Sequence, residues 1–506
     1  MKKQLLKACF AFSLLSFYAC GDLLETESDT YITKSKLDAL LETNETAKIT
    51  VVQSLLSGMY AHLVDFDSYT GEYHDDYGLS SLLHMADLMG EDMVQTSSAY
   101  SWYYRDYQLD ARMSDYVRPA MVWQYLYRGI KISNDILAQI PDDVQNSTLK
   151  HMRGQALAMR AMNYHYLVQF FQKTYVGHED DPAVPLITEV PSAHNGRSSM
   201  RVVYQQMIDD LTESQLLLSD YVRTDKGAID KQVAHGLLAR IYLCMENWPL
   251  AAREAQAARS GYALMPRSAY LDGFKNISNV EWMFGTDINP ESETVKTQIC
   301  NFSSFVSSFS YGYASLTGMF KAIDKRLYDH INPSDVRKKA YQSPDLKTFP
   351  NGGFGGVALP AYVNGKFGGS DDGGGNTQDL LYMRASEMYL IEAEALAAQG
   401  DTTAFDVFDS FIQTRDTAFT RLAHMQALLQ EIRQQRRIEL WGEAGIAYFD
   451  IKRLKLGITR SYAGTNHPYD AQLDLPAESW RFTYQLPNSE IENNPDIDQD
   501  DNNPKE

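Results

Sequence analysis

A repeat-like spacing of small and aromatic residues between positions 230 and 266 constrains the fold of this chain more than any other feature. The four positions that carry it are Ala239, Tyr242, Ala251 and Ala258. The second and third follow the first after 3 and 12 residues, and the fourth follows the third after 7. This spacing matches the tetratricopeptide repeat, whose small residues let two antiparallel helices approach closely. Pro266 then ends the unit, since proline cannot continue a helix.

Further helices are indicated by apolar residues at intervals of three and four. They are expected at 35–64, 119–140, 149–171, 210–221 and 424–441, with a weaker repeat at 383–414. Ser147 or Thr148 is the expected N-cap of the third. With 44% hydrophobic residues the chain can bury a large core. We therefore predict an all-α fold, a tetratricopeptide-like scaffold of stacked helix pairs.

The rest of the chain lacks this regularity. Residues 267–380 mix short strand-like runs, such as the one at 281–284, with stretches rich in Ser and Tyr, and predict an irregular insertion. Ten of the 31 glycines lie in 350–377, which indicates a loop because glycine loses backbone entropy in regular elements. The acidic last eighteen residues predict a solvated tail. We expect one unit over 20–506, with halves of about 20–225 and 226–506.

The N-terminus has the form of a secretory leader. Lys2 and Lys3 precede an uncharged run at 8–19, which is too short for the roughly 20 residues that span a bilayer. Ala19-Cys20 then predicts a bacterial lipoprotein signal over 1–19, with Cys20 as the lipidated first residue; the alternative is ordinary cleavage with Cys20 a spare thiol. No later segment has 18 uninterrupted apolar residues. Cys244 and Cys300 either form a disulfide or stay free, and the helical pattern around Cys244 favours a buried free thiol.

Three C-terminal segments and the N-terminal cysteine resemble one known family, SusD/RagB. The segments are Arg436-Arg437-Ile438-Glu439-Leu440-Trp441-Gly442-Glu443 with Tyr448-Phe449-Asp450-Ile451-Lys452-Arg453, then Arg384-Ala385-Ser386-Glu387-Met388-Tyr389, and finally Leu486-Pro487-Asn488-Ser489-Glu490-Ile491. Asp335-Val336-Arg337 is similar to the Asp-x-Arg of that family, and Cys20-Gly21-Asp22 matches its N-terminus. Together these features span residues 20 to 497.

The resemblance implies a lipid-anchored protein, held by Cys20, on the outer face of a Bacteroidetes-type outer membrane. Members of the family cap a SusC-like, TonB-dependent transporter and hand it oligosaccharides, or peptides in some branches. The implied fold is all-α, with four tetratricopeptide-like helix pairs and an irregular half that faces the ligand.

Charge and motif content argue against several other functions. A formal charge of −20 repels phosphate backbones, so we expect no nucleic-acid partner. The chain has no His-Glu-x-x-His, Gly-x-Ser-x-Gly, phosphate-loop or Cys-x-x-Cys motif, and we expect no catalytic residue, metal or cofactor. The Arg- and Glu-rich C-terminal signature suits structural pairing, such as Glu431 with Gln435 and Arg437 with the turn of Glu439. Asp450, Lys452 and Arg453 are likewise expected to be structural.

The candidate ligand site follows from the tyrosines. Eleven of the 32 lie between 60 and 127, and consecutive Trp102-Tyr103-Tyr104 cannot all face one core. In starch-binding relatives, aromatics from a loop in this part of the chain meet others from the mid-chain insertion around the sugar. The candidate contacts here are Asp92, Tyr100, Trp102, Tyr103, Tyr104, Tyr311 and Tyr313, with Phe309, Arg105 and Asp106 nearby. Tyr164, Tyr242, Tyr389 and Trp282 are expected to be packing residues.

Three functional hypotheses follow. The first is a glycan-binding lipoprotein that delivers its ligand to the transporter. The second is the same architecture serving a peptide or another nutrient, or acting chiefly as a lid. The third and weakest is a surface glycoside hydrolase, since a pair of carboxylates is enough for that chemistry.

Overall fold

The computed structural model describes residues 43–66, 69, 73–190, 194–348, 359–368 and 376–505. The chain divides into two units, residues 1–54 and 55–506, and helix α3 (Glu45–Ala61) crosses that boundary. The leader, Cys20 and most of the glycine-rich stretch 350–377 lie outside the described residues, so the predictions for them stay predictions. Everything below concerns residues 55–506.

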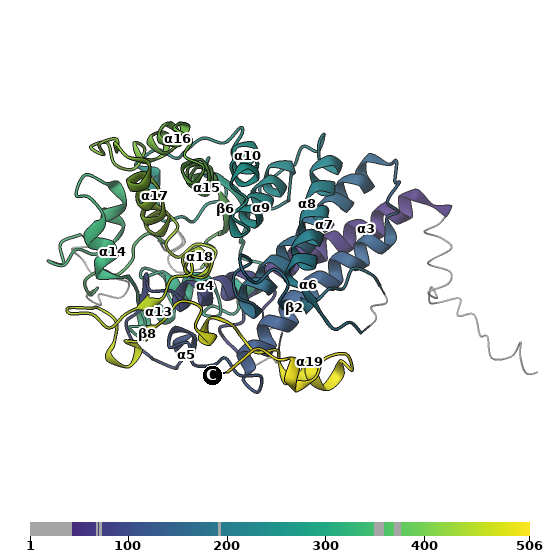
Figure 1. Cartoon of the computed structure of the whole chain (residues 1–506), viewed down its shortest axis with the longest axis horizontal. Helices are drawn as coiled ribbons and strands as arrows, with labels where there is room; N and C mark the ends of the chain where they lie inside the picture. The colour runs from purple at the N-terminus through teal and green to yellow at the C-terminus, as the bar shows by residue number, and fades with distance from the viewer. Residues whose placement is uncertain are drawn as a thin grey trace, which may run out of the picture. The chain divides into compact units, whose positions relative to one another are not determined.

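The long helices of this unit are set by ordinary capping and by apolar faces (Figure 1). They are α4 (Leu79–Met89), α6 (Val117–Gln139), α7 (Ser147–Phe171), α8 (Met200–Leu217), α9 (Lys231–Cys244), α10 (Trp248–Ala258), α15 (Ala385–Ala398), α16 (Thr403–Ile412), α17 (Met425–Glu439) and α18 (Ile446–Arg453). Side chains of Asn146, Ser199, Asp230 and Asn247 cap α7 to α10 by accepting a backbone N–H bond. The N-cap of α7 is thus Asn146, just before the predicted pair.

Successive helices pack against one another as the repeat spacing predicts. Helix α7 lies between α6 and α8, α9 packs on α8 and α10, and α15 packs on α10, α16 and α17. The repeat positions Ala239, Ala251 and Ala258 are fully buried, and Tyr242 is 7% exposed. A Cβ at Gly236 of α9 would come within 2.4 Å of Met383 Sδ, so a larger residue there would displace the Met383 side chain. The predicted all-α, tetratricopeptide-like scaffold is confirmed.

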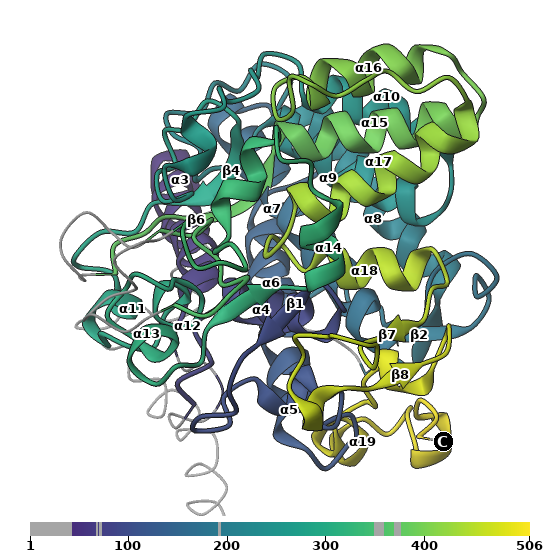
Figure 2. The same cartoon turned by 90° about the vertical axis from the view of Figure 1, so that its left-hand side faces the viewer.

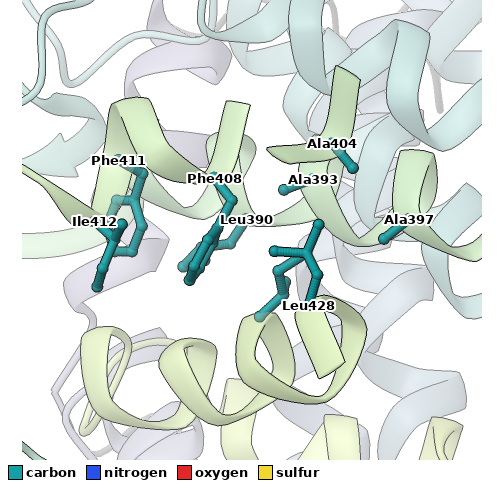
Figure 3. Close-up of a cluster of buried hydrophobic side chains, with 9 residues drawn as sticks. Leu390, Ala393, Ala397, Ala404, Phe408, Phe411, Ile412 and Leu428 are labelled. Carbon is teal, nitrogen blue, oxygen red and sulfur yellow. The ribbon is translucent and has the colours of Figure 1, made fainter. Parts of the chain in front are cut away.

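Figure 3 shows the core of the last repeat, where α15, α16 and α17 meet. Its buried side chains are Leu390, Ala393, Ala397, Ala404, Phe408, Phe411, Ile412, Leu428 and Ile432. Phe408 of α16 lies beside Leu390 of α15, and Ala404 of α16 lies beside Ala393 of α15, so large and small side chains fill the gap together. The core of this repeat therefore follows from the same sequence pattern that predicted the helices.

The chain between α10 and α15 forms the predicted irregular half. It contains α11 (Glu293–Lys296), α12 (Phe302–Val306), α13 (Tyr313–Leu316) and α14 (Lys325–His330). Figure 2 shows α11, α12 and α13 grouped at the left of the view, while α14 lies apart from them, nearer the centre. The described strands make four two-stranded antiparallel pairs: β1 (Met93–Gln95) with β5 (Lys321–Ile323), β2 (Pro182–Pro185) with β3 (Arg197–Ser199), β4 (Trp282–Thr286) with β6 (Leu380–Arg384), and β7 (Ile458–Thr459) with β8 (Asp474–Leu475). Trp282 is fully buried, as expected.

A buried network of charged side chains joins this half to the helices. In it Arg337, Arg384, Arg415 and Lys366 face Asp335, Glu281, Glu439 and Glu443, and all eight side chains are at most 5% exposed. The C-terminal signature is therefore structural in its described contacts. Gln435 bonds Glu431 over 2.7 Å as predicted. The prediction for Arg437 was wrong, because Arg437 pairs with Glu91 and Asp92 while Glu439 turns into the network.

The acidic C-terminal segment is not a free tail. It forms α19 (Asn488–Asn493) and then packs back on the protein, with Ile497 4% exposed. Asn503 Nδ2 donates to the carbonyls of Phe171 and Tyr484 over 2.5 and 2.7 Å. Buried amide contacts thus outweigh the repulsion among its exposed acids.

Two smaller expectations concern the cysteines and the membrane. Cys244 and Cys300 are both buried and form no disulfide, and burial raises the pKa of the Cys244 thiol to about 11. Over the described ranges, no helix has both the length and the apolar character to cross a bilayer.

Candidate functional site

The candidate site lies at one end of the β1–β5 pair, where the segment after β1 meets the segment before β5. Strand β1 pairs with β5 in antiparallel register, Met93 opposite Ile323 and Gln95 opposite Lys321. The chain leaving β1 carries Tyr100 and Trp102, and the chain entering β5 carries Tyr311 and Tyr313. Residues more than two hundred positions apart are thereby brought together, as the family resemblance implied.

A cavity of about 280 Å³ opens beside the first of these segments. Its walls are Tyr73, Asp75, Tyr100, Ser101, Trp102, Arg105, Asp106, Ala111, Tyr116, Val117 and Arg118. They come from the 73–76 segment, from helix α5 (Tyr104–Tyr107) and the loop leading into it, and from the chain between α5 and the first turn of α6. The cavity is at the lower end of the size range for small-molecule sites.

Aromatic rings form one wall of the cavity. The Tyr100 side chain is 75% exposed, and its ring meets the edge of Tyr313 at 5.9 Å. The half-buried Trp102 indole stacks on His74 at 5.2 Å and 17°, and it meets Tyr313 edge-on at 6.3 Å. His74 Nδ1 also lies 2.6 Å from the Tyr313 hydroxyl. The indole is therefore fixed from behind, which suits a rigid surface for stacking.

The floor of the cavity is charged and mostly paired. Arg118 donates to both Asp75 and Asp106, and the latter contact is 2.9 Å. Burial raises the pKa of Asp106, although Arg118 opposes that shift. Asp75 is 1% exposed, and its Oδ1 has no hydrogen-bond partner among the described residues. A buried acceptor without a partner is costly, so Asp75 offers a hydroxyl-bearing ligand a ready contact.

Three of the predicted contacts do not line this cavity, because their side chains are buried against other groups. Tyr103 is 1% exposed, and its hydroxyl donates to Asp75 O and Ser81 Oγ over 3.0 Å. Tyr104 is 6% exposed and donates to Asp470 Oδ1 over 2.6 Å. Asp92 is 2% exposed and accepts hydrogen bonds from Arg437. The left-handed backbone at Tyr103, with φ of 59°, turns the chain between Trp102 and Tyr104, so the two rings face different surroundings.

The predicted residues of the segment before β5 also include both exposed and buried rings. Tyr311 is 53% exposed, so its ring remains a prediction for ligand contact. Tyr313 is 8% exposed and stacks on Phe305 at 4.7 Å, so it supports Trp102 and Tyr100 from behind. Phe309 packs against the apolar cluster that contains Val94.

Sequence reasoning missed most of the other residues around the cavity, among them His74, Asp75, Tyr116 and Arg118. The run at 73–76, Tyr-His-Asp-Asp, was the available signal, since three polar side chains follow one another inside the tyrosine-rich stretch. Tyr116 and Arg118 stand at the start of a helix, where no pattern separates them from ordinary surface residues. Arg105 does line the cavity, with its guanidinium 5.7 Å from the centre of the Tyr116 ring.

A second and larger cavity, of about 900 Å³, lies along α6. Two of the polar groups on its walls are already paired: Trp123 Nε1 donates to Glu490 Oε2 over 3.1 Å, and the Tyr127 hydroxyl donates to Pro185 O over 2.7 Å. Among the described side chains, no group of three or more His, Cys, Asp or Glu residues could hold a metal ion. The smaller cavity, with its exposed rings and its unpaired carboxylate oxygen, is the better candidate for recognition.

Two family models match the chain. Residues 37–243 match a model described as starch-binding and associating with the outer membrane, and residues 288–504 match the SusD family. A SusD-like protein of Bacteroides ovatus is 24% identical over 318 residues, covering 55% of this chain. The match likewise spans only about half, 55%, of that curated relative.

Solved structures share the fold over most of the chain. A SusD-like carbohydrate-binding protein of Bacteroides vulgatus is 25% identical, with a TM-score of 0.76, and the match covers 90% of this chain and 98% of that one. Surface glycan-binding protein A of Bacteroides thetaiotaomicron, solved with laminarihexaose, is 17% identical. Its TM-score is 0.65, and the match covers 88% of this chain and 98% of that protein.

Proposed function

The chain belongs to the SusD/RagB family, and from that premise we propose that it is a cell-surface glycan-binding lipoprotein of an outer-membrane uptake system. It binds oligosaccharides and delivers them to a SusC-like, TonB-dependent transporter. Cys20 carries the lipid that holds it to the outer membrane. Its role is binding and transfer, without cleavage of the glycan.

The observation that carries this proposal is the combination of exposed rings with an unpaired buried acceptor. Pyranose rings have apolar C–H faces and hydroxyl edges, so they suit a surface of aromatic planes bordered by hydrogen-bonding groups. Tyr100 and Trp102 supply the planes, and Asp75 Oδ1 supplies an acceptor. The laminarihexaose ligand of surface glycan-binding protein A supports a glycan as the ligand class here.

Affinity electrophoresis of the purified mature chain tests the binding step. The gels contain laminarin, starch or another single neutral polysaccharide, and retardation in one of them is the expected result. Trp102→Ala should raise the Kd about thirtyfold or more, since a fixed aromatic anchor typically contributes over 2 kcal/mol. The matched control is Trp480→Ala, which removes a half-buried indole that lines neither cavity.

Each other outcome excludes a specific part of the proposal. If no polysaccharide of a broad panel retards the wild type, glycan binding is wrong and a peptide or lid role replaces it. If Trp102→Ala and Tyr100→Ala both bind like the wild type, the site is elsewhere, and the cavity along α6 is tested next. Release of oligosaccharide from the polysaccharide would instead identify a hydrolase.

The transporter step has its own test. Detergent extraction and pull-down through the lipid-anchored protein should recover a large β-barrel partner. Replacing Cys20 with alanine removes the acceptor for the lipid and should move the protein from the membrane to the soluble fraction. A Cys20→Ala variant that stays with the membrane would contradict lipid anchoring.

A further inference from the structure

The loop at 460–472 lines neither cavity, but it contacts helix α5, which directly follows the segment with Tyr100 and Trp102. We propose that His467 and Asp470 of this loop are positioning residues for ligand binding: they hold α5, and through it the loop that carries Tyr100 and Trp102. That the ligand is a glycan rests on the proposed function, whereas the support of α5 by this loop does not depend on which ligand binds.

The backbone around α5 is strained and needs support from outside. Helix α5 has only four residues. Three non-glycine residues around it, Ser101, Tyr103 and Leu109, have left-handed φ angles of 65°, 59° and 50°. Such conformations are unfavourable for residues with a side chain, and they persist only where surrounding contacts hold them. They also tend to cluster at ligand-binding sites.

The 460–472 loop supplies part of that support. The Tyr104 hydroxyl donates to Asp470 Oδ1 over 2.6 Å, and Gln108 Nε2 donates to the Asp470 carbonyl over 2.9 Å. One turn away, the Tyr107 hydroxyl bonds His467 Nδ1, and the two rings stack at 5.8 Å. Both tyrosines of α5 are thereby tied to one loop, which Figure 2 shows beside α5.

The same loop is anchored to the segment that carries the other aromatic residues. His467 Nε2 lies 3.2 Å from Asp324 Oδ2, and Tyr462 donates to that oxygen over 2.9 Å. Asn466 Nδ2 donates to the carbonyl of Ile323 in β5 over 2.9 Å. Strand β5 directly follows the segment with Tyr311 and Tyr313, so one loop bridges the two halves of the proposed binding surface.

This arrangement gives Tyr104 a role other than the predicted ligand contact. Its ring is buried and its hydroxyl holds the Asp470 carboxylate, so it transmits the position of the loop to the neighbouring residues 100–103. Asp470 itself is exposed at the surface, so its substitution removes the contact with Tyr104 while disturbing the rest of the fold little.

The test compares three variants of the full mature chain. Asp470→Ala removes the acceptor for Tyr104, and Asp470→Asn retains a side-chain oxygen that can accept. Asp209→Ala is the control, because it removes an exposed acid of α8 whose Oδ1 accepts from Gln205 Nε2 instead. Hydrogen–deuterium exchange is followed on residues 96–109, and binding is followed with the polysaccharide that retards the wild type.

We expect Asp470→Ala to speed exchange at 101–109 and to raise the Kd about tenfold, the scale of one charge-assisted hydrogen bond. Asp470→Asn should return exchange and Kd most of the way to the wild-type values, and Asp209→Ala should change neither. Unchanged exchange at 101–109 in Asp470→Ala overturns the positioning role, whether or not any glycan binds. Faster exchange with an unchanged Kd also overturns it. Absence of binding by the wild type instead counts against the proposed function, while the exchange result still decides whether the loop holds α5.

Discussion

Neutralising Glu439 should destabilise the protein strongly, because this carboxylate is the centre of the buried charge network. Its Oε2 accepts from Arg337 Nη1 over 3.0 Å, and its Oε1 accepts from Arg384 Nη1 over 2.5 Å and Arg415 Nη2 over 2.9 Å. The side chain is fully buried. Burial opposes its charge, but the three guanidinium groups hold the pKa of Glu439 well below its ordinary value.

The magnitude follows from the charge balance. Four cations face four carboxylates in the network, so Glu439→Gln leaves one positive charge unbalanced in a dry interior. The new amide N–H₂ group also directs a donor at guanidinium donors. Breaking a buried ion pair from one side costs about 3–5 kcal/mol. With an unfolding entropy of about 1 kcal/mol per kelvin for a chain of this length, the Tm should fall by roughly 3–5 °C.

Differential scanning calorimetry and urea unfolding measure this loss. The matched control is Glu431→Gln on the same helix, whose side chain is 20% exposed and pairs with His330 at 3.5 Å. A pair of that kind contributes at most about 1 kcal/mol. If Glu439→Gln unfolds at the temperature of the wild type, or no lower than Glu431→Gln, the network does not stabilise the fold through its charge.

Two further changes test other parts of the structure. Phe408→Ala should lower the free energy of unfolding in urea by about 3–5 kcal/mol, because the ring fills the core between α15, α16 and α17. The control Ser410→Ala, on the exposed face of α16, should lower it by under 1 kcal/mol, and equal losses in the two variants would contradict the packing. Burial opposes ionisation of Asp450, but Arg436 and Arg453 lower its pKa to about 2, below the unfolded value of about 3.9. Its contribution, about 2–3 kcal/mol, is therefore present above pH 4 and lost as the pH falls toward 2. Asp450→Asn should flatten the pH dependence of the Tm in that window, and an unchanged slope would contradict the shift.

The sequence by itself determined the scaffold. Helix pairs depend on local patterns, such as the apolar face of α7 and the small residues Ala239, Ala251 and Ala258, and these patterns repeat along the chain. Side chains that pack within a helix pair lie close in sequence, so their spacing reveals them. The family resemblance rests on similar local segments, and it also placed the aromatic loop near 100 at the proposed site.

Only the tertiary structure decided which side chains face the cavity. Trp102, Tyr103 and Tyr104 are equivalent in the sequence, yet Trp102, between left-handed Ser101 and Tyr103, lines the cavity while Tyr103 and Tyr104 are buried. Asp75 and Arg118 join the site through contacts between segments far apart in the chain. Arg437 of α17 bonds to Asp92, more than three hundred residues away in the chain, and not to a residue of its own helix. Backbone turns and long-range ion pairs have no period in the sequence, so the direction of each side chain had to come from the folded protein.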